Sequence, residues 1–206
     1  MIALMKIYVS RLMTALVASI AFGGMSTQSQ AMNQNNTHSF AAQGAAYTNM
    51  ATSQLIQFAN SGDKSAQFFL GNRYQVGSGV TKDTQQAFRW FMSAAQQGAA
   101  PAQLNVGQMY AVGKGVTKDL VQARQWLERA ARQGDNRASY NLALISEHKQ
   151  DLTGAYRWYE LAARPEMLSD TVRQRARSKL AKLMTRLSSV DISRAHEATN
   201  SWLHQN

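Results

Sequence analysis

Small and apolar residues in the middle of the chain recur at helical spacing. In one segment, residues four positions apart share a helix face: Ala66, Leu70 and Tyr74. In the segment that follows, spacings of three and four place three more on one face: Ala87, Trp90 and Ala94. The pattern predicts two amphipathic helices in succession.

The same pattern is written twice. Residues 66–101 and 102–137 are identical at half of their positions, in phase at a period of 36 residues. Gly77-Ser-Gly79 becomes Gly113-Lys-Gly115, and paired glycines are typical of a helix end followed by a turn. An Asp follows each turn and can cap the second helix. Repetition at this period predicts a stacked helical repeat.

A third, shortened unit covers residues 138–167. Trp158 follows Ala138 by 20 positions, where the earlier units have 24, so the glycine turn has lost four residues. Ser146 stands where the other units have Tyr. Residues 51–62 match a lone second helix, which gives an array of about three and a half units over 48–167. Stacked neighbours supply the core that one helix pair cannot form.

These motifs resemble the Sel-1-like repeat family, a relative of tetratricopeptide repeats. Residues 66–98 and 102–134 carry the family's Ala, Leu-Gly, Tyr, Gly-x-Gly-Val, Asp, Trp and Ala-Ala positions almost completely. The resemblance implies an all-α fold, an α/α superhelical solenoid of antiparallel helix pairs. It also implies binding of a protein or peptide and, as is usual in the family, no catalysis, so we expect the chain not to be an enzyme.

The first 31 residues have the pattern of a secretory signal peptide. Lys6 and Arg11 precede an uncharged apolar run over 12–24, and Ser29-Gln-Ala31 is a small-x-small cleavage site. The run is shorter than the ~20 residues of a spanning helix, although an uncleaved anchor is the alternative. We therefore expect export to a periplasm, and no membrane span once the signal is removed. Residues 32–47, polar and uncharged, predict a flexible tether.

Two basic helices are predicted in residues 168–206, as a polar cap on the array. Residues 171–206 hold seven basic and two acidic side chains, within a chain of net charge +10. Four of the basic residues form a stripe that could contact an anionic surface: Arg175, Lys179, Lys182 and Arg186. The alternative is a solvated face that keeps the chain soluble. Export argues against nucleic acid as the partner.

No residues with catalytic or metal-binding spacing stand out. Ser61-Gly-Asp-Lys64 has the Ser-x-x-Lys spacing of penicillin-recognising enzymes, but Ser-Asp-Asn and Lys-Thr-Gly are absent. The four histidines form no i, i+4 pair and the chain has no Cys. The sequence therefore predicts no catalytic residues, no metal site and no cofactor.

The partner-binding groove is predicted on the first helix of each unit, opposite its core stripe. That face mixes apolar groups with amides, which suits an extended peptide. Its predicted residues are Phe68, Asn72, Gln75, Leu104, Gln108, Tyr140, Leu144 and Glu147. The alternative is that the first predicted residue on each helix packs against the adjacent unit: Phe68, Leu104 and Tyr140.

The sequence favours a periplasmic or exported protein-interaction scaffold or regulator. Two other functions stay open at this stage. One is an envelope enzyme of the penicillin-binding or hydrolase type, and the other is a secreted virulence factor that binds a host protein.

Overall fold

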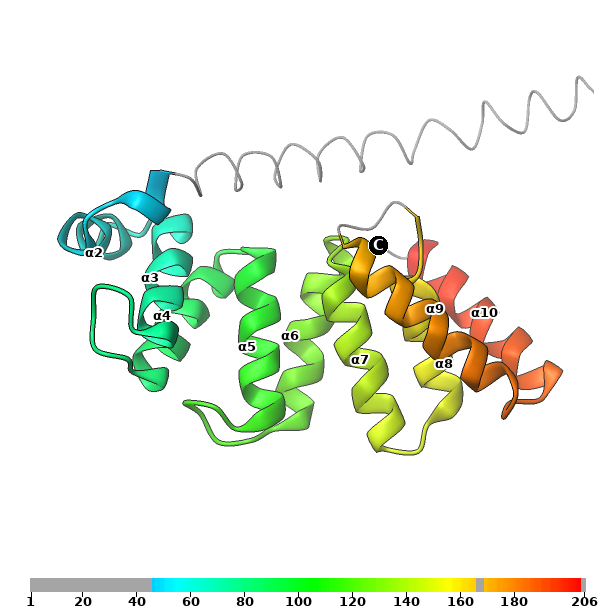
Figure 1. Cartoon of the computed structure of the whole chain (residues 1–206). Helices are drawn as coiled ribbons and strands as arrows, with labels where there is room; N and C mark the ends of the chain where they lie inside the picture. The colour runs from blue at the N-terminus through cyan, green and yellow to red at the C-terminus, as the bar shows by residue number, and fades with distance from the viewer. Residues whose placement is uncertain (1–45, 166–168, 205–206) are drawn as a thin grey trace, which may run out of the picture. The chain divides into compact units, whose positions relative to one another are not determined.

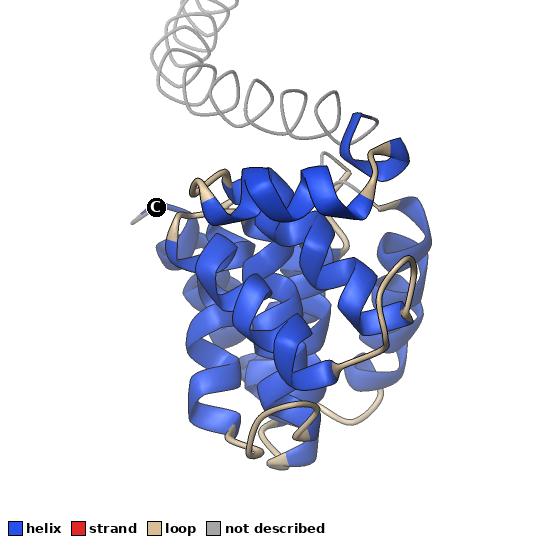
Figure 2. Cartoon of the chain, turned by 90° about the vertical axis from the view of Figure 1, so that its left-hand side faces the viewer, coloured by secondary structure: helices blue, strands red, loops and turns tan. Residues whose placement is uncertain are grey.

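The computed structural model describes residues 46–165 and 169–204, and the regular secondary structure in these ranges is helical (Figure 2). The chain divides into two units, Met1–Gln43 and Gly44–Asn206. All described residues belong to the second unit. The predicted signal peptide, 1–31, and most of the predicted tether lie outside the described residues.

Among the described residues, three helix pairs follow one another, with a short helical turn and α2 before them and two helices after them (Figure 1). The closest packing is within the pairs α3–α4, α5–α6 and α7–α8, and the second helix of each pair packs on the next element. The prediction of an all-α array of helix pairs is confirmed. The helices are α2 (Thr52–Asn60), α3 (Lys64–Val76), α4 (Thr84–Gln96), α5 (Ala100–Val112), α6 (Leu120–Arg132), α7 (Asn136–His148), α8 (Leu152–Ala162), α9 (Asp170–Met184) and α10 (Ser189–His204).

The ends of the helices follow from local chemistry. The Asp119 carboxylate accepts hydrogen bonds from the backbone N–H groups of Val121 and Gln122, at 2.8 and 3.0 Å, and so caps α6. Asp83 caps α4 in the same way. Gly113 ends α5 in the left-handed region at φ +76°, which glycine adopts without steric cost.

In the first two pairs, a missing side chain brings the two helices together; α7 has Ala143 at the corresponding position. A Cβ on Gly71 would lie 2.8 Å from the Phe91 ring, and a Cβ on Gly107 would lie 2.6 Å from Leu127 Cγ. Phe91 and Leu127 are both fully buried. The two glycines therefore mark the close helix approach that their recurrence suggested.

Glutamine side chains connect consecutive units. Gln103 is buried, donates to the carbonyl of Ala95 at 3.2 Å and accepts from Gln133 at 2.8 Å. One period earlier, Gln67 donates to Ala59 and accepts from Gln97, at 3.1 and 2.8 Å. Each relay satisfies buried amide groups across a boundary between units.

Arg73 ties residues 46–50 to α3. Its guanidinium donates to the hydroxyl of Thr52 and to the carbonyls of Tyr47, Thr48 and Met50. The Tyr47 ring packs on Phe58 and Phe69, with centroids 6.1 and 6.0 Å apart. The last residues of the predicted tether, 46–47, thus belong to a helical turn held on the array.

The last two helices do not repeat the geometry of the earlier pairs. Both α9 and α10 pack chiefly on α8, and Trp202 of α10 meets Trp158 edge to face at 5.4 Å. The fully buried Asn136 holds the start of α9, because its amide donates to Ser169 O at 3.0 Å and accepts from Ser169 N at 3.3 Å. The predicted cap is therefore assembled around α8 and not as a fourth helix pair.

Each glycine turn also lies against the unit before it. A Cβ on Gly115, at φ +72°, would lie 2.1 Å from the carbonyl oxygen of Thr84. Gly79 is similarly close to the hydroxyl of Thr52, at 2.5 Å. The turns therefore help to set how one unit stacks on the next.

We predict that Gly115→Ala lowers the free energy of unfolding by more than about 3 kcal/mol, because it combines positive φ with a backbone clash. Gly98→Ala is the matched control, since Gly98 has φ +84° but nothing within 4 Å of a built Cβ. We expect the control to cost only about 1–2 kcal/mol. Urea denaturation measures both values, and equal losses would mean that the contact with Thr84 is unimportant.

The shortened third turn places a non-glycine residue in the left-handed region. Gln150 has φ +61°, between the C-cap Lys149 and the N-cap Asp151 of α8. Left-handed backbone costs a residue with a side chain about 1–2 kcal/mol.

We predict that Gln150→Gly raises the free energy of unfolding by up to about 1 kcal/mol, after subtraction of the entropy that glycine adds to the unfolded chain. Lys149→Gly is the control, at φ −83°, and should only destabilise. Paired urea titrations give the difference. A loss of stability in both variants would show that Gln150 is unstrained.

Candidate functional site

The predicted groove residues fall into three environments. Gln108 and Leu144 are exposed, and Leu144 retains 39% of its accessible surface. Asn72 and Gln75 are half-buried on α3. The remaining four residues contact other parts of the array.

Leu104 lies in the core, with 4% of its surface exposed. The expectation that it faces an open groove is wrong, because it packs in the cluster formed by α6, α7 and α8. Phe68 is half-buried, with its ring 5.8 Å from the buried Phe91 and 5.3 Å from Phe69. Phe68 therefore packs on rings of its own unit, whereas the alternative reading had it packing against the adjacent unit.

Glu147 joins the third unit to the C-terminal helices. Its carboxylate accepts from the Tyr159 hydroxyl at 2.9 Å and pairs with Lys179 Nζ at 2.8 Å. Tyr140 packs edge to face on the Tyr159 ring at 5.2 Å. Glu147 therefore connects α7, α8 and α9 and is not an open groove residue.

Burial and the neighbouring Glu147 carboxylate raise the pKa of Tyr159 well above its usual value of 10.0. Burial disfavours the phenolate, and the hydrogen bond to Glu147 requires the neutral hydroxyl. Tyr159 thus stays a donor wherever the protein is folded.

The predicted basic stripe is divided by this ion pair. Arg175 and Lys182 are exposed on α9 and Arg186 is exposed in the turn after it, whereas Lys179 pairs with Glu147 and lies 5.7 Å from the Tyr159 ring centroid. Three of the four side chains are therefore free to face solvent.

The described residues show no group of three or more His, Cys, Asp or Glu side chains that could hold a metal ion. The hydroxyl of Ser61 donates to the carbonyl of Phe58 at 2.8 Å in an exposed turn. Within the described ranges, no helix has the length and apolar character needed to cross a membrane.

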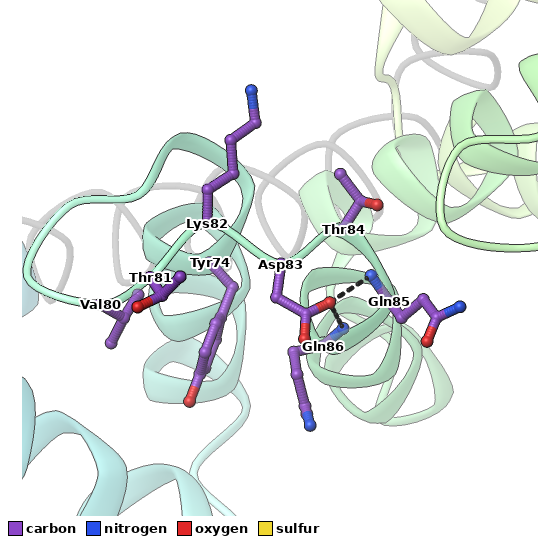
Figure 3. A pocket seen from close by; sticks show the side chains of 8 residues that line it. All are labelled: Tyr74, Val80, Thr81, Lys82, Asp83, Thr84, Gln85 and Gln86. Carbon is purple, nitrogen blue, oxygen red and sulfur yellow. Dashed lines mark hydrogen bonds between the residues drawn. The ribbon is translucent and has the colours of Figure 1, made fainter.

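The turn of the first unit forms an open hollow (Figure 3). Its residues run from Val80 to Gln86, with Tyr74 at the base. Asp83 is occupied by its cap, since it accepts from the backbone N–H groups of Gln85 and Gln86 at 2.9 and 3.0 Å. The carboxylate in the hollow is therefore committed to capping α4.

Three segments match the Sel1 repeat: residues 64–98, 100–135 and 137–164. The crystal structure of a Sel1 repeat protein from Oxalobacter formigenes is 37% identical, with a TM-score of 0.51, and the alignment covers 61% of this chain and 96% of that one. The chain belongs to the Sel1 repeat family. No curated protein matches it significantly.

A second Sel1-like structure is that of c5321, described as a protective antigen present in uropathogenic Escherichia coli strains. It is 32% identical, with a TM-score of 0.56, over 69% of this chain. The match spans only 35% of the E. coli protein. Sel1 repeats commonly mediate protein interactions and usually form non-catalytic scaffolds.

We predict that Glu147→Ala lowers the free energy of unfolding by about 1–3 kcal/mol, because it leaves the Tyr159 hydroxyl and Lys179 without their acceptor. Glu128→Ala is the matched control. It removes an exposed i, i+4 pair with Arg124 at 2.8 Å and should cost about 0.5 kcal/mol or less. Urea denaturation at neutral pH compares the two, and equal losses would contradict a connecting role for Glu147.

The free energy of unfolding of the same two variants can be compared at high pH. The raised pKa of Tyr159 contributes stability that is complete below pH 10.0 and is lost as pH rises further, because the unfolded chain releases the phenol proton first. Removing Glu147 removes one cause of the raised pKa. Burial, the larger cause, remains, so both variants should lose stability in parallel between about pH 9 and about pH 11, and the Glu147 variant should lose less only above that range.

Proposed function

We propose that this Sel1 repeat protein is an exported scaffold or regulator of the cell envelope, which holds a partner protein on the first helices of its units. Protein binding is common among Sel1 repeats. The observation that carries the proposal is the face of α5 and α7 on which Gln108 and Leu144 are exposed to solvent. Asn72 and Gln75 continue this face on α3.

The chemistry of this face suits an extended peptide. Leu144 supplies an apolar anchor, and the amides of Asn72, Gln75 and Gln108 can bond the backbone of a peptide. The half-buried rings of Phe68 and Tyr140 are held by contacts with Phe91 and Tyr159. The apolar part of the surface is therefore rigid, which limits the entropy lost on binding.

Helix α9 adds positive charge beyond α7. Arg175, Lys182 and Arg186 would attract an acidic partner or an anionic surface and would raise the rate of encounter more than the final affinity. Binding that depends on these residues should be sensitive to salt, whereas contacts with Leu144 should not.

Export is proposed from the sequence alone. The basic start, the short apolar run and the small residues before position 32 are typical of a signal peptide, and a periplasm is the compartment we favour.

A secreted factor is the second candidate. It is favoured by the 32% identity to c5321, which is described as a protective antigen. An enzyme of the penicillin-binding type has no comparable support. Its Ser61 lies in an exposed turn and donates to a neighbouring carbonyl.

We predict that Leu144→Arg lowers the crosslinked recovery of a dominant partner by about tenfold or more, as expected for the loss of an apolar anchor. Tagged chain is crosslinked in its own cells, and periplasm and medium are analysed separately at low and high salt. The matched control is Val121→Arg on α6, where an apolar residue with 62% exposure lies off the proposed face.

Recovery that survives high salt and fails only in the Leu144 variant supports the proposed face. Equal recovery from both variants would reject the proposed face. Recovery at low salt alone would indicate that the partner binds the basic residues of α9 and the turn after it. Material in the medium instead of the periplasm would favour the secreted factor.

A further inference from the structure

The third unit lacks a contact that the earlier boundary has. Between the first and second units, Phe88 of α4 meets Tyr110 of α5 edge to face, with ring centroids 5.3 Å apart. The positions 36 residues later are Arg124 of α6 and Ser146 of α7. An aromatic pair is therefore replaced by a guanidinium and a small hydroxyl.

The turn above this position is also shorter. Residues 113–119 join α5 to α6, but only 149–151 join α7 to α8. In the earlier units, the turn contacts the preceding unit through its second glycine: Gly79 lies against Thr52, and Gly115 lies against Thr84. The third turn has no glycine pair with which to cover the start of α6 in this way.

A cavity of about 240 Å³ occupies this region. Its polar lining comes from α6, α7, the short turn, α8 and α10: Arg124, Ser146, Asp151, Thr153, Arg157 and Arg194. The volume is below the roughly 300–1,000 Å³ of pockets for drug-sized ligands, so it suits one small group.

Arg157 differs from the other two arginines in its partners. Arg124 pairs with Glu128 at 2.8 Å, and Arg194 pairs with Asp191 at 3.3 Å. The Nε of Arg157 is buried and donates to no acceptor among the described residues. Its guanidinium stacks on the Trp158 ring, with 4.5 Å between Cζ and the ring centroid. This stacking holds the planar guanidinium in place.

The surroundings of Arg157 disfavour its charge. Burial, and then the nearby Arg124, lower the pKa of Arg157 from its usual value, against smaller opposing effects of Glu128 and Asp151. Asp151 is the lining carboxylate, but it accepts from the Gly154 N–H at 2.8 Å and caps α8. A buried donor on a cation is costly to leave unpaired, and an incoming anion would correct this.

We propose that this cavity binds a single carboxylate group, with the Arg157 guanidinium as its main partner and the Ser146 and Thr153 hydroxyls as further donors. A planar fork matches a carboxylate with two parallel hydrogen bonds. Arg124 and Arg194 are already paired, so one incoming negative charge balances the site better than the two of a phosphate.

The carboxylate has two sources, a free small acid or an acidic side chain of a polypeptide. The cavity is separate from the residues proposed above for partner binding, so the inference stands without that function. If the polypeptide source is correct, the cavity adds a preference for acidic sequences to the same protein.

The test follows the Nε–Hε resonance of Arg157 by NMR in the full chain. The probes are sodium acetate and the peptide acetyl-Ala-Glu-Ala-amide, with sodium chloride and acetyl-Ala-Gln-Ala-amide as their controls at equal ionic strength. We expect a saturable shift with both carboxylates and none with the controls. Tenfold tighter binding of the peptide identifies a polypeptide source, and equal or weaker binding identifies a free acid.

Arg157→Gln should weaken acetate binding by about tenfold or more, as expected for the loss of a charged hydrogen-bond donor, and Arg157→Lys should restore only part of it. These variants are followed by the resonance of Arg124. The matched control is Arg89→Gln, the exposed arginine that precedes Trp90 as Arg157 precedes Trp158.

Ser146→Tyr provides a second variant that keeps Arg157. It returns the side chain that the other units have at this position and should fill the cavity, which would abolish the shift. Unsaturable shifts, shifts equal to those in chloride or glutamine peptide, or unchanged binding in Arg157→Gln or Ser146→Tyr would overturn the proposal.

Discussion

The close approach of two helices across Gly71 and Gly107 is the contact on which the other packing depends. With no side chain on α3 or α5 at these points, Phe91 and Leu127 fill the space and are fully buried. A methyl group there would force Phe91 or Leu127 to shift, which a densely packed core absorbs only at a cost. In α7 the corresponding residue is Ala143, and it is fully buried. The facing helices α4 and α6 carry the small residues Ala87 and Ala123, which keep the distance between the two helices of each pair short.

Polar contacts between units also fix how neighbouring units are aligned. The amide of Gln103 or Gln67 can reach its two partners only when neighbouring units are aligned, because the acceptor and the donor belong to different helices. At the ends of the array, a single side chain takes the place of this pair of glutamines. Arg73 binds the carbonyls before α2, and Asn136 binds Ser169 before α9.

Local signals made most of the fold predictable from sequence. Asp119 caps the helix that follows it, and Gly113 ends the helix before it, so neighbouring residues were enough to place both boundaries. Leu104 was misplaced because its burial depends on the next unit, which helical phase alone does not report. The partner of Glu147, Lys179, is 32 residues away on a helix outside the repeat. No period in the sequence indicates that contact, nor the packing of α10 on α8.

Positions that keep the repeat and positions that break it have different physical roles. Where the period holds, side chains are committed to neighbours, as Gln133 is to Gln103 and Gln97 is to Gln67. Where it fails, groups are released from packing, as with the unpaired Nε of Arg157 beside Ser146. A buried donor without an acceptor reduces stability, and the stacking on Trp158 does not satisfy the Nε. Recognition gives a reason to retain such a donor, since an anion can contribute binding energy only where the protein has left a donor unsatisfied. The irregular third unit, more than the two regular ones, is therefore where we expect the specificity of this chain to reside.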